Sequence, residues 1–386
     1  MPSDPSFSQI FTNLVKRFLP NSQAVALALI LLFGFLIVFY LGNILMPVLV
    51  AIVIAYLLEG LIAKVEFLKI PRIIAVFLVY FTFMAGLAFL LFVLMPMLYE
   101  QTLQLVQHTP AMIKAMQKEV MRLPEMYPQL ISEDKLKTIV FSAQQEILTY
   151  TQELLSFSAA SVISLVTAMV YLVLVPMLVF FFIKDKQDII VWATQFLPKD
   201  RHLSMRVWQE VDMQIGNYVR GKFVEIVILW VASYVTFSLL GLNYAMLLAV
   251  FMGLQAIIPY VGATLVTFPV IGVAYFQWGV NADEFLYIVI AYAIIQIIDG
   301  VALVPLLFSE AVNLHPIAII VAILFFGGLW GFWGVFFAIP LATLVKAVVS
   351  AWPKNNEISQ DTELISDLSQ SGNISISEVL HKNQIQ

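Results

Sequence analysis

The stretch that decides the fold class is residues 73–99, IIAVFLVYFTFMAGLAFLLFVLMPMLY, which contains no charged side chain. Roughly 20 apolar residues in a helix cross the hydrocarbon core of a bilayer, so this stretch is long enough to span a membrane. Similar runs recur along the chain, where 61% of the residues are hydrophobic and 12% are charged. Soluble domains carry about 25% charged residues. The sequence therefore predicts an all-α, polytopic membrane protein with eight hydrophobic segments.

The composition also excludes several classes of function. The chain has no Cys and only four His, so thiolate metal sites cannot form and a zinc site has few ligands. Its net charge of −5 lacks the basic excess that binding to a phosphate backbone needs. No HExxH motif indicates an intramembrane metalloprotease. We therefore expect no cofactor, no metal, no nucleic-acid partner and no enzymatic activity.

Basic residues set the expected orientation of the N-terminal part, because cytoplasmic loops are enriched in Lys and Arg. Residues 1–23 are expected to form a cytoplasmic segment. Residues 24–99 are expected to form transmembrane helices 1–3, with a tight turn at Gly42 and Asn43 between the first two. The third of these helices would then emerge on the outer side of the membrane.

A long polar segment follows and divides the two halves of the membrane region. Residues 100–156 are expected to form short amphipathic helices outside the cytoplasm, broken by Pro110, Pro124 and Pro128. Residues 157–183 form a fourth uncharged segment, which we interpret as transmembrane helix 4. It would return the chain to the cytoplasm.

The C-terminal half begins with the densest basic loop of the chain. Residues 184–222 are expected to form a cytoplasmic basic amphipathic loop, with an interfacial helix over residues 203–218. Residues 223–350 are expected to form a membrane bundle with broken helices. Residues 351–386 are rich in Ser, Asn, Asp and Glu, and we expect a disordered cytoplasmic tail. Both termini would then lie inside.

Two of the C-terminal hydrophobic blocks are interrupted near their middle. The block 246–275 contains Ile258-Pro-Tyr-Val-Gly-Ala263, and the block 316–349 contains Gly327-Gly-Leu-Trp-Gly-Phe-Trp-Gly334. Each block is either one kinked crossing or a re-entrant hairpin of two half-helices. The chain would cross the membrane eight times in the first case, and six times with two hairpins in the second.

One nucleotide-binding motif is incomplete. Residues 216–222, GNYVRGK, match seven positions of a phosphate-binding P-loop, but the eighth is Phe223 and lacks the hydroxyl that would bind Mg²⁺. The motif also continues an amphipathic helix instead of following a strand. We therefore expect transport by a secondary mechanism that does not use ATP.

Asp299 lies midway along the hydrophobic segment 285–308, where an ionised side chain facing lipid costs at least ~2.5 kcal/mol. No Lys or Arg occurs between Lys222 and Lys346. Tyr292, Gln296 and Asp299 share one helical face through their i, i+4 and i+7 spacing. We interpret this face as part of a substrate or ion pathway, and the alternative is a protonated Asp that only holds helices together.

The interrupted blocks supply the other candidate residues, because unpaired backbone groups at bilayer depth are tolerated only within protein or beside water. Discontinuous helices often mark a transporter's binding site. The pathway candidates here are Gln255, Pro259, Tyr260 and Gly262. The structural or gating candidates are Gly327, Gly328, Gly331, Gly334, Pro340, Asn313, His315 and Pro316. The glycines could instead form a packing face, and His315 could be an ordinary interfacial residue.

Several short motifs occur in a fixed order along the second half of the chain. They are Tyr218-Val-Arg-Gly221, Ile258-Pro-Tyr-Val-Gly262, Gln296-Ile-Ile-Asp299, Pro305, Asn313-Leu-His-Pro316 and the glycine run that leads to Ala338-Ile-Pro340. Together they resemble the autoinducer-2 exporter family of bacterial membrane transporters, and most of all its PerM-like permeases. The resemblance spans residues 24–353. This sequence has Asp299 where many relatives have Glu, and Lys222 where many have Gln.

The resemblance implies a multi-pass permease of the bacterial inner membrane that works without an ATPase. Some members of the family export a furanone-type signalling molecule and others exchange Na⁺ for H⁺. We therefore expect a secondary transporter that exports a small polar organic solute of the autoinducer-2 type. A cation/proton antiporter is the alternative, and a non-transporting membrane scaffold is the second alternative. The expected partners are the solute or ion, membrane lipid and a homo-oligomer.

Overall fold

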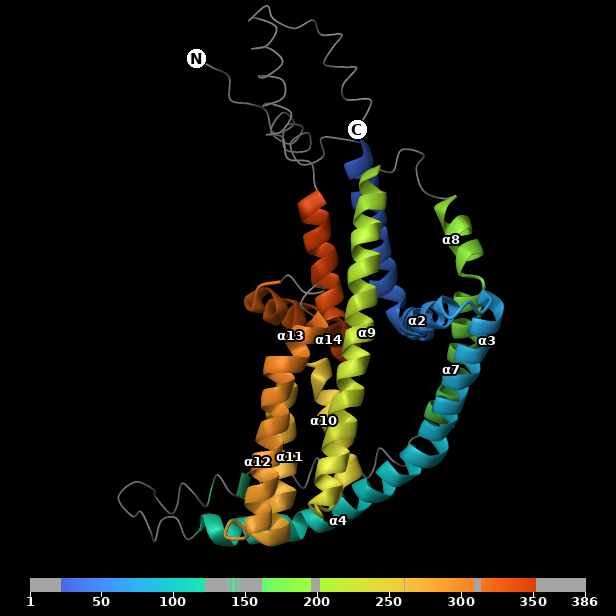
Figure 1. The fold of residues 1–386 in the computed structure, drawn as a ribbon. Helices are drawn as coiled ribbons and strands as arrows, with labels where there is room; N and C mark the ends of the chain where they lie inside the picture. The colour runs from blue at the N-terminus through green and yellow to red at the C-terminus, as the bar shows by residue number, and fades with distance from the viewer. Residues whose placement is uncertain are drawn as a thin grey trace, which may run out of the picture. The chain divides into compact units, whose positions relative to one another are not determined.

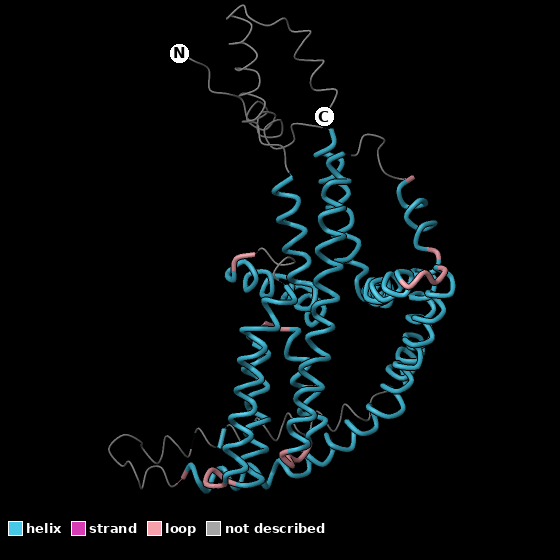
Figure 2. Tube along the Cα trace, in the orientation of Figure 1, coloured by secondary structure: helices cyan, strands magenta, loops and turns pink. Residues whose placement is uncertain are grey.

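The computed structural model describes residues 22–121, 138, 141–142, 145, 162–195, 202–259, 261–308 and 314–351. Within these ranges every regular element is a helix, as Figure 2 shows. Seven helical stretches are long and apolar enough to cross a membrane, and two shorter apolar helices accompany them. The predicted polytopic all-α class is therefore confirmed. The chain divides into two compact units, and the candidate residues described below lie in the larger one, Ile44–Trp192 with Met213–Ala342.

The helices are labelled in chain order in Figure 1. The N-terminal ones are α2 (Ser22–Phe67), α3 (Arg72–Phe89), α4 (Met95–Val120), α7 (Val162–Lys184) and α8 (Lys186–Thr194). The C-terminal ones are α9 (His202–Leu239), α10 (Ala245–Leu254), α11 (Val261–Trp278), α12 (Asp283–Ile298), α13 (Val304–Phe308) and α14 (Pro316–Ala351).

The tight turn predicted at Gly42 and Asn43 is wrong. Both residues, and Pro47 after them, lie within the single helix α2. Gly and Asn weaken a helix by less than about 1 kcal/mol each, which does not end it. In an apolar environment the helix is also favoured because backbone groups have no water to replace a lost hydrogen bond.

The break predicted at Pro110 is also absent. Helix α3 passes through a π-helical turn, Leu90–Leu94, directly into α4, and α4 contains Pro110 in its interior. The π turn comes just before Pro96, where a wider turn relieves the clash between the proline ring and the carbonyl four residues earlier. Pro124 and Pro128 lie outside the described residues. The segment that starts at residue 100 is thus helical at least as far as Val120.

Helix α9 joins two segments that the sequence analysis treated separately. The predicted interfacial helix over residues 203–218 and the hydrophobic segment after Lys222 form one uninterrupted helix. The C-terminal half of α9 packs with α10, α11 and α12. Their shared core includes Leu229, Phe237, Leu248, Val270 and Ile288. Lys222 therefore lies inside a long helix rather than in a loop.

The first interrupted block folds as a helical hairpin. Helices α10 and α11 pack against each other and are joined by a single 3-10 turn, Gln255–Ile257, and an extended Ile258. At the open end, Gln277 accepts a hydrogen bond from the Asn243 N–H and donates one to the Gly241 carbonyl, at 2.8 Å each. Helix α10 has 10 residues, about 15 Å of helix, which is too short to cross a bilayer of ~30 Å.

The second interrupted block also turns back on itself. Gly331 has φ 59° and ψ −135°, a conformation that only glycine adopts without strain, and it divides α14 into two helical halves. A Cβ at Gly334 would collide with the Phe326 carbonyl oxygen, and Ala322 and Phe326 pack with Ala338. Each interruption therefore divides its hydrophobic block into two helical halves that pack against each other.

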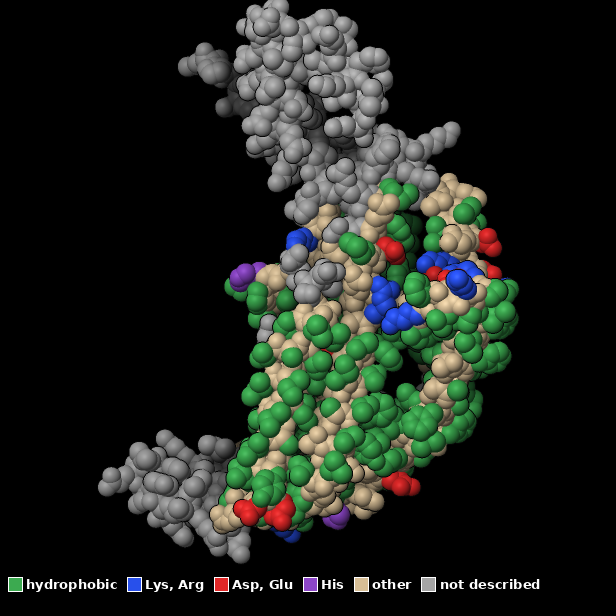
Figure 3. Space-filling model, in the orientation of Figure 1, with side chains coloured by type: hydrophobic (Ala, Val, Ile, Leu, Met, Phe, Trp, Pro, Cys, Tyr) green, Lys and Arg blue, Asp and Glu red, His purple; other side chains and the backbone are tan. Residues whose placement is uncertain are grey.

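The outer surface of these helices is apolar. Large side chains such as Phe92, Leu265 and Phe268 are mostly exposed, and Figure 3 shows hydrophobic side chains over most of the visible face. Such a surface would aggregate in water but matches the hydrocarbon of a bilayer. In the described part of the chain only a few polar side chains are buried, and they mark the site.

Candidate functional site

Most of the buried polar side chains of the described residues lie on α9 and at the tip of the α10–α11 hairpin. On α9 they are Lys222, Glu225 and Ser233, and at the tip there is Gln255. Lys222 is 5% exposed and Glu225 is 2% exposed. Charged side chains are almost never buried to this degree unless they are paired.

Lys222 and Glu225 form a buried ion pair at adjacent turns of α9. Their Nζ and Oε2 atoms are 2.6 Å apart, as the i, i+3 spacing on a helix permits. The Lys222 ammonium also donates a hydrogen bond to the Ala256 carbonyl oxygen at 2.8 Å and lies 4.8 Å from the centre of the Phe308 ring. The side chain thus connects α9, the hairpin tip and α13.

The Ala256 carbonyl is available because of the proline that follows it. In the 3-10 turn, the Ile258 N–H bonds to the Gln255 carbonyl three residues earlier. The same register would give the Ala256 carbonyl the N–H of residue 259, but Pro259 has none. The interruption in the sequence therefore leaves an acceptor for Lys222.

Asp299 lies near this ion pair, at the start of a second π turn, Asp299–Leu303. The turn precedes Pro305, as the first π turn precedes Pro96. Asp299 is within electrostatic range of both Lys222 and Glu225. Its Oδ1 atom is buried and has no hydrogen-bond partner among the described residues. Glu225 therefore pairs directly with the ammonium group, and Asp299 is a second carboxylate near it that makes no ion pair within 4.0 Å in the described part of the chain.

A row of amide and hydroxyl groups continues from the hairpin tip along α12. The Gln296 amide nitrogen donates to the Gln255 Oε1 atom at 3.0 Å and to the Tyr292 hydroxyl at 2.9 Å. The Tyr292 hydroxyl is also hydrogen bonded to Thr267 at 2.6 Å and to the Ala263 carbonyl at 3.1 Å. The structure thus brings together Tyr292, Gln296 and Gln255, which the sequence placed on two different segments.

Gly262 allows the hairpin tip to close. A Cβ on this residue would collide with the Gln255 carbonyl oxygen, so any side chain would push the two halves of the tip apart. Gly272, in the same helix, has no heavy atom within 4 Å of the corresponding position. The close approach at Gly262 is therefore specific to the tip and positions Gln255 and Ala256.

The second hairpin distinguishes among the other glycine candidates. Gly331 and Gly334 are required by its geometry, whereas a Cβ on Gly328 would meet nothing within 4 Å. A Cβ on Gly327 would approach only the Val335 side chain, at 2.8 Å. Pro340 is buried on the returning half.

The predicted residues between α13 and α14 have a simpler structural role. His315 is exposed, and its Nδ1 atom accepts a hydrogen bond from the Ile317 N–H at 3.3 Å, beside Pro316 at the start of α14. These contacts satisfy the N-terminal turn of the helix. Asn313 and Tyr260 lie outside the described residues.

The base of the first hairpin is held by α4. The Gln101 side chain accepts a hydrogen bond from the Leu247 N–H at 2.9 Å, and the His108 ring is hydrogen bonded to the Tyr244 hydroxyl at 2.6 Å. Burial raises the pKa of Tyr244, which favours the neutral hydroxyl. The hairpin is thereby anchored at its open end, while the α-helical hydrogen-bond pattern is interrupted at its tip.

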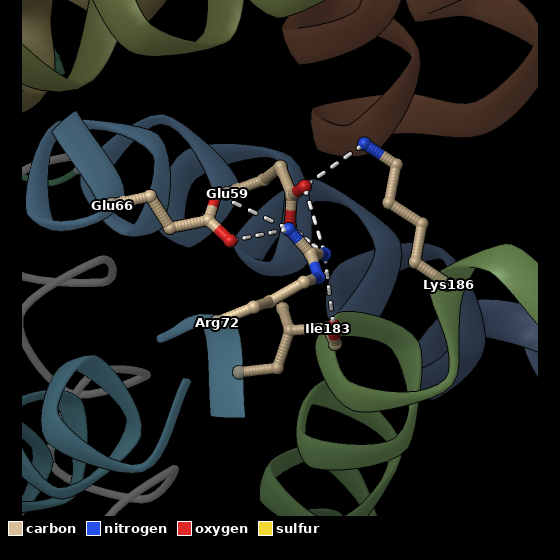
Figure 4. A network of polar contacts seen from close by, with 5 residues as sticks. All are labelled: Glu59, Glu66, Arg72, Ile183 and Lys186. Atoms are coloured by element: carbon tan, nitrogen blue, oxygen red, sulfur yellow. Dashed lines mark hydrogen bonds and ion pairs between the residues drawn. The ribbon is translucent and has the colours of Figure 1, made fainter. Parts of the chain in front are cut away.

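A second charged network lies at the ends of α2, α3 and α7 (Figure 4). Arg72 pairs with Glu59 at 3.1 Å and with Glu66 at 3.4 Å, and it donates to the Ile183 carbonyl at 3.5 Å. Lys186 at the start of α8 also pairs with Glu59, at 3.1 Å. All four charged side chains are 22–41% exposed, so water screens them.

The comparison with known proteins identifies the family. A family model described as AI-2E family transporter matches residues 26–354. The chain belongs to the AI-2E transporter family. It is 44% identical over 346 residues to PerM of Escherichia coli strain K12, which is named a permease, covering 90% of this chain and 98% of PerM. It is also 26% identical over 315 residues to YueF of Bacillus subtilis strain 168, which is named a transport protein, covering 80% of this chain and 84% of YueF.

In this AI-2E transporter the pairing of Lys222 with Glu225 was not predicted from the sequence. Lys222 was noticed as the end of a P-loop-like motif, which the structure places entirely within α9, and as a departure from many relatives, but not as a member of an ion pair. The i, i+3 spacing of the two residues was available as a signal. It would have indicated an ion pair once residues 203–240 were taken as one helix.

Proposed function

We propose that this AI-2E transporter exports a small polar organic solute of the autoinducer-2 type across the bacterial inner membrane by a secondary mechanism that does not use ATP. The observation that carries the proposal is the row of hydrogen-bonding groups at the hairpin tip, Gln255, Gln296 and Tyr292. A neutral hydroxylated solute is recognised by such donors and acceptors rather than by ion pairs.

The position of this row along α12 agrees with a site inside the membrane. Gln296 lies 13 residues after Asp283, where α12 begins. At 1.5 Å per residue it is roughly 20 Å from that end, within a hydrocarbon core of ~30 Å. A re-entrant α10–α11 hairpin would bring Gln255 to the same depth.

Two buried polar atoms at the site have no hydrogen-bond partner among the described residues. One is the Gln255 Nε2 atom, which is a donor, and the other is the Asp299 Oδ1 atom, which is an acceptor. Leaving either group unpaired costs about 1–3 kcal/mol. A solute that carries hydroxyl and carbonyl groups would satisfy both, which supports its binding here.

Cation/proton antiport is the second candidate, because Asp299 and Glu225 form a pair of neighbouring carboxylates within electrostatic range. Antiport was the alternative function expected from the sequence, where only Asp299 was singled out as its carboxylate. The folded chain adds Glu225 as a second acid in its neighbourhood. However, Lys222 already neutralises Glu225, which leaves one carboxylate for a coupling ion.

Flux measurements in proteoliposomes test the proposal. The full chain should move a radiolabelled dihydroxyfuranone without ATP, with imposed H⁺ and Na⁺ gradients applied separately. Gln296→Leu should reduce this flux at least tenfold, because it removes the hydrogen bonds of the amide to Gln255 and Tyr292. Thr82→Val is the control, because Thr82 is exposed on α3 and bonds only to its own helix. Equal flux in Gln296→Leu and the native chain would contradict the proposal.

The proposed orientation has both termini in the cytoplasm, and it is tested by labelling single cysteines in intact cells. The native chain has no cysteine to remove. An impermeant thiol reagent added from outside should label Gln117→Cys in α4 and should not label Ser204→Cys in α9. Labelling at position 204 but not at 117 would reverse the topology.

A further inference from the structure

Lys222 is surrounded by groups that ordinarily bind a cation. Its ammonium contacts the Glu225 carboxylate at 2.6 Å and a backbone carbonyl at the hairpin break at 2.8 Å. It lies over the Phe308 ring, and the Asp299 carboxylate is within electrostatic range. Carbonyls freed at broken helices and intramembrane carboxylates coordinate coupling ions in transporters, and aromatic faces attract cations.

We propose that the Lys222 ammonium is a tethered cation that occupies a monovalent-cation site formed by the Glu225 carboxylate and the Ala256 carbonyl, with Asp299 as a nearby second acid. The chain would then need no alkali cation, and removing the ammonium would open the site to Na⁺ or Li⁺. One consequence, that solute export is independent of Na⁺, rests on the proposed function. The other, that removing the ammonium lets Na⁺ or Li⁺ bind, does not rest on it.

The charges of the site favour a monovalent occupant. Two carboxylates and one ammonium leave a net charge of −1 when both acids are ionised. A neutral side chain at position 222 would leave −2 in a desolvated place, and a bound monovalent ion would restore the original balance. Calcium takes six to eight oxygen ligands, whereas the Lys222 ammonium contacts one carboxylate oxygen and one carbonyl oxygen.

The arrangement is not what a purely stabilising ion pair requires. A buried ion pair gains little net stability, because desolvation offsets the attraction. Here a second acid, Asp299, is added beside the pair with its Oδ1 atom unpaired. That addition costs stability and is expected where the carboxylates serve to hold a positive charge.

The test measures thermal unfolding of the purified full chain in detergent, in NaCl and in choline chloride at equal ionic strength. The native chain should melt at the same temperature in both salts. Lys222→Met should show a saturable rise of a few degrees in NaCl and none in choline chloride, since an ion that binds only the folded state stabilises it. Adding Glu225→Gln to this variant should abolish the rise.

Lys186→Met is the matched control. It removes a lysine that also pairs with a glutamate, Glu59, but in the exposed network. Its melting temperature should not distinguish the two salts. A specific effect of Na⁺ on Lys222→Met and not on Lys186→Met would assign the ion to the buried site.

Several results would overturn the proposal. They are a native chain that Na⁺ stabilises, a Lys222→Met variant that responds to pH but not to Na⁺, and one that responds to neither. If Lys222→Met cannot be purified in choline chloride, its recovery in NaCl would support the site, and its loss in both salts would refute it. Absent solute flux together with these melting shifts would refute the proposed function and leave this inference standing.

Discussion

The two charged clusters of the larger unit have similar residue types and opposite surroundings. The rim cluster, Glu59, Glu66, Arg72 and Lys186, is partly exposed and joins the ends of α2, α3, α7 and α8. The inner cluster, Lys222, Glu225 and Asp299, is desolvated and joins α9, the hairpin tip and the α12–α13 break. Exposed ion pairs contribute little to the free energy of unfolding. Buried charges lower stability through desolvation, and they are retained where function needs them.

The largest expected effect comes from breaking the inner pair from one side. Glu225→Leu would leave the buried Lys222 ammonium without its carboxylate, which typically costs about 3–5 kcal/mol of unfolding free energy. Thermal or denaturant unfolding in detergent should show this loss. If the unfolding free energy of Glu225→Leu stays within about 1 kcal/mol of that of the native chain, the inner pair behaves like an exposed pair of the rim cluster, which would contradict the expected difference.

The second-largest effect is expected at the hairpin tip, which supplies the Ala256 carbonyl. Gly262→Ala forces a methyl group against the Gln255 carbonyl, and we expect a cost of about 1–3 kcal/mol and at least a tenfold loss of solute flux. Gly272→Ala is the matched control in the same helix. Since it meets no neighbouring atom, it should be neutral or stabilising by up to ~1 kcal/mol with native flux. If both variants transport equally well, the tip does not line the path.

Asp299→Asn separates charge from hydrogen bonding within the inner cluster. The amide keeps the size and an acceptor atom, so the unfolding free energy should change by about 1 kcal/mol. A solute exporter should keep partial flux that no longer varies with pH, whereas an antiporter should lose all cation-coupled proton movement. If the acid only holds helices together, flux should stay native in Asp299→Asn and stability should fall only in Asp299→Ala. Native flux in both variants would exclude Asp299 from the mechanism.

The smallest effect is expected at the rim. Lys186→Met removes one exposed pair with Glu59, while Arg72 keeps its own pairs. The unfolding free energy should fall by about 0.5 kcal/mol, and flux should be unchanged. A large loss of flux in this variant would show that the rim cluster also serves transport.

Hydrophobic length alone predicted the all-α membrane class, because spans of this length are set by bilayer thickness. Proline and glycine also located both interruptions, at residues 258–263 and 327–334. The choice between kinked crossings and hairpins could not be made, since it depends on contacts such as that of Gly334 with Phe326.

The candidate site was predicted only in part. The helical spacing of Tyr292, Gln296 and Asp299 gave one face, but the contact of Gln296 with Gln255 depends on how the hairpin packs against α12. Asp299 had no basic residue near it in sequence. Its positive neighbour, Lys222, lies on α9 and comes near Asp299 only through tertiary packing. Because the two residues are far apart in sequence, local sequence patterns do not reveal that they are neighbours.

The central claim is that the inner charges serve transport rather than stability. The most direct test replaces both partners of the pair, Lys222→Met with Glu225→Met, and measures melting temperature and dihydroxyfuranone flux on the same preparation. Well-packed apolar residues often replace a buried ion pair without loss of stability. The account predicts a melting temperature equal to or above that of the native chain and a flux below one tenth of it. A stable double variant with native flux would contradict the account.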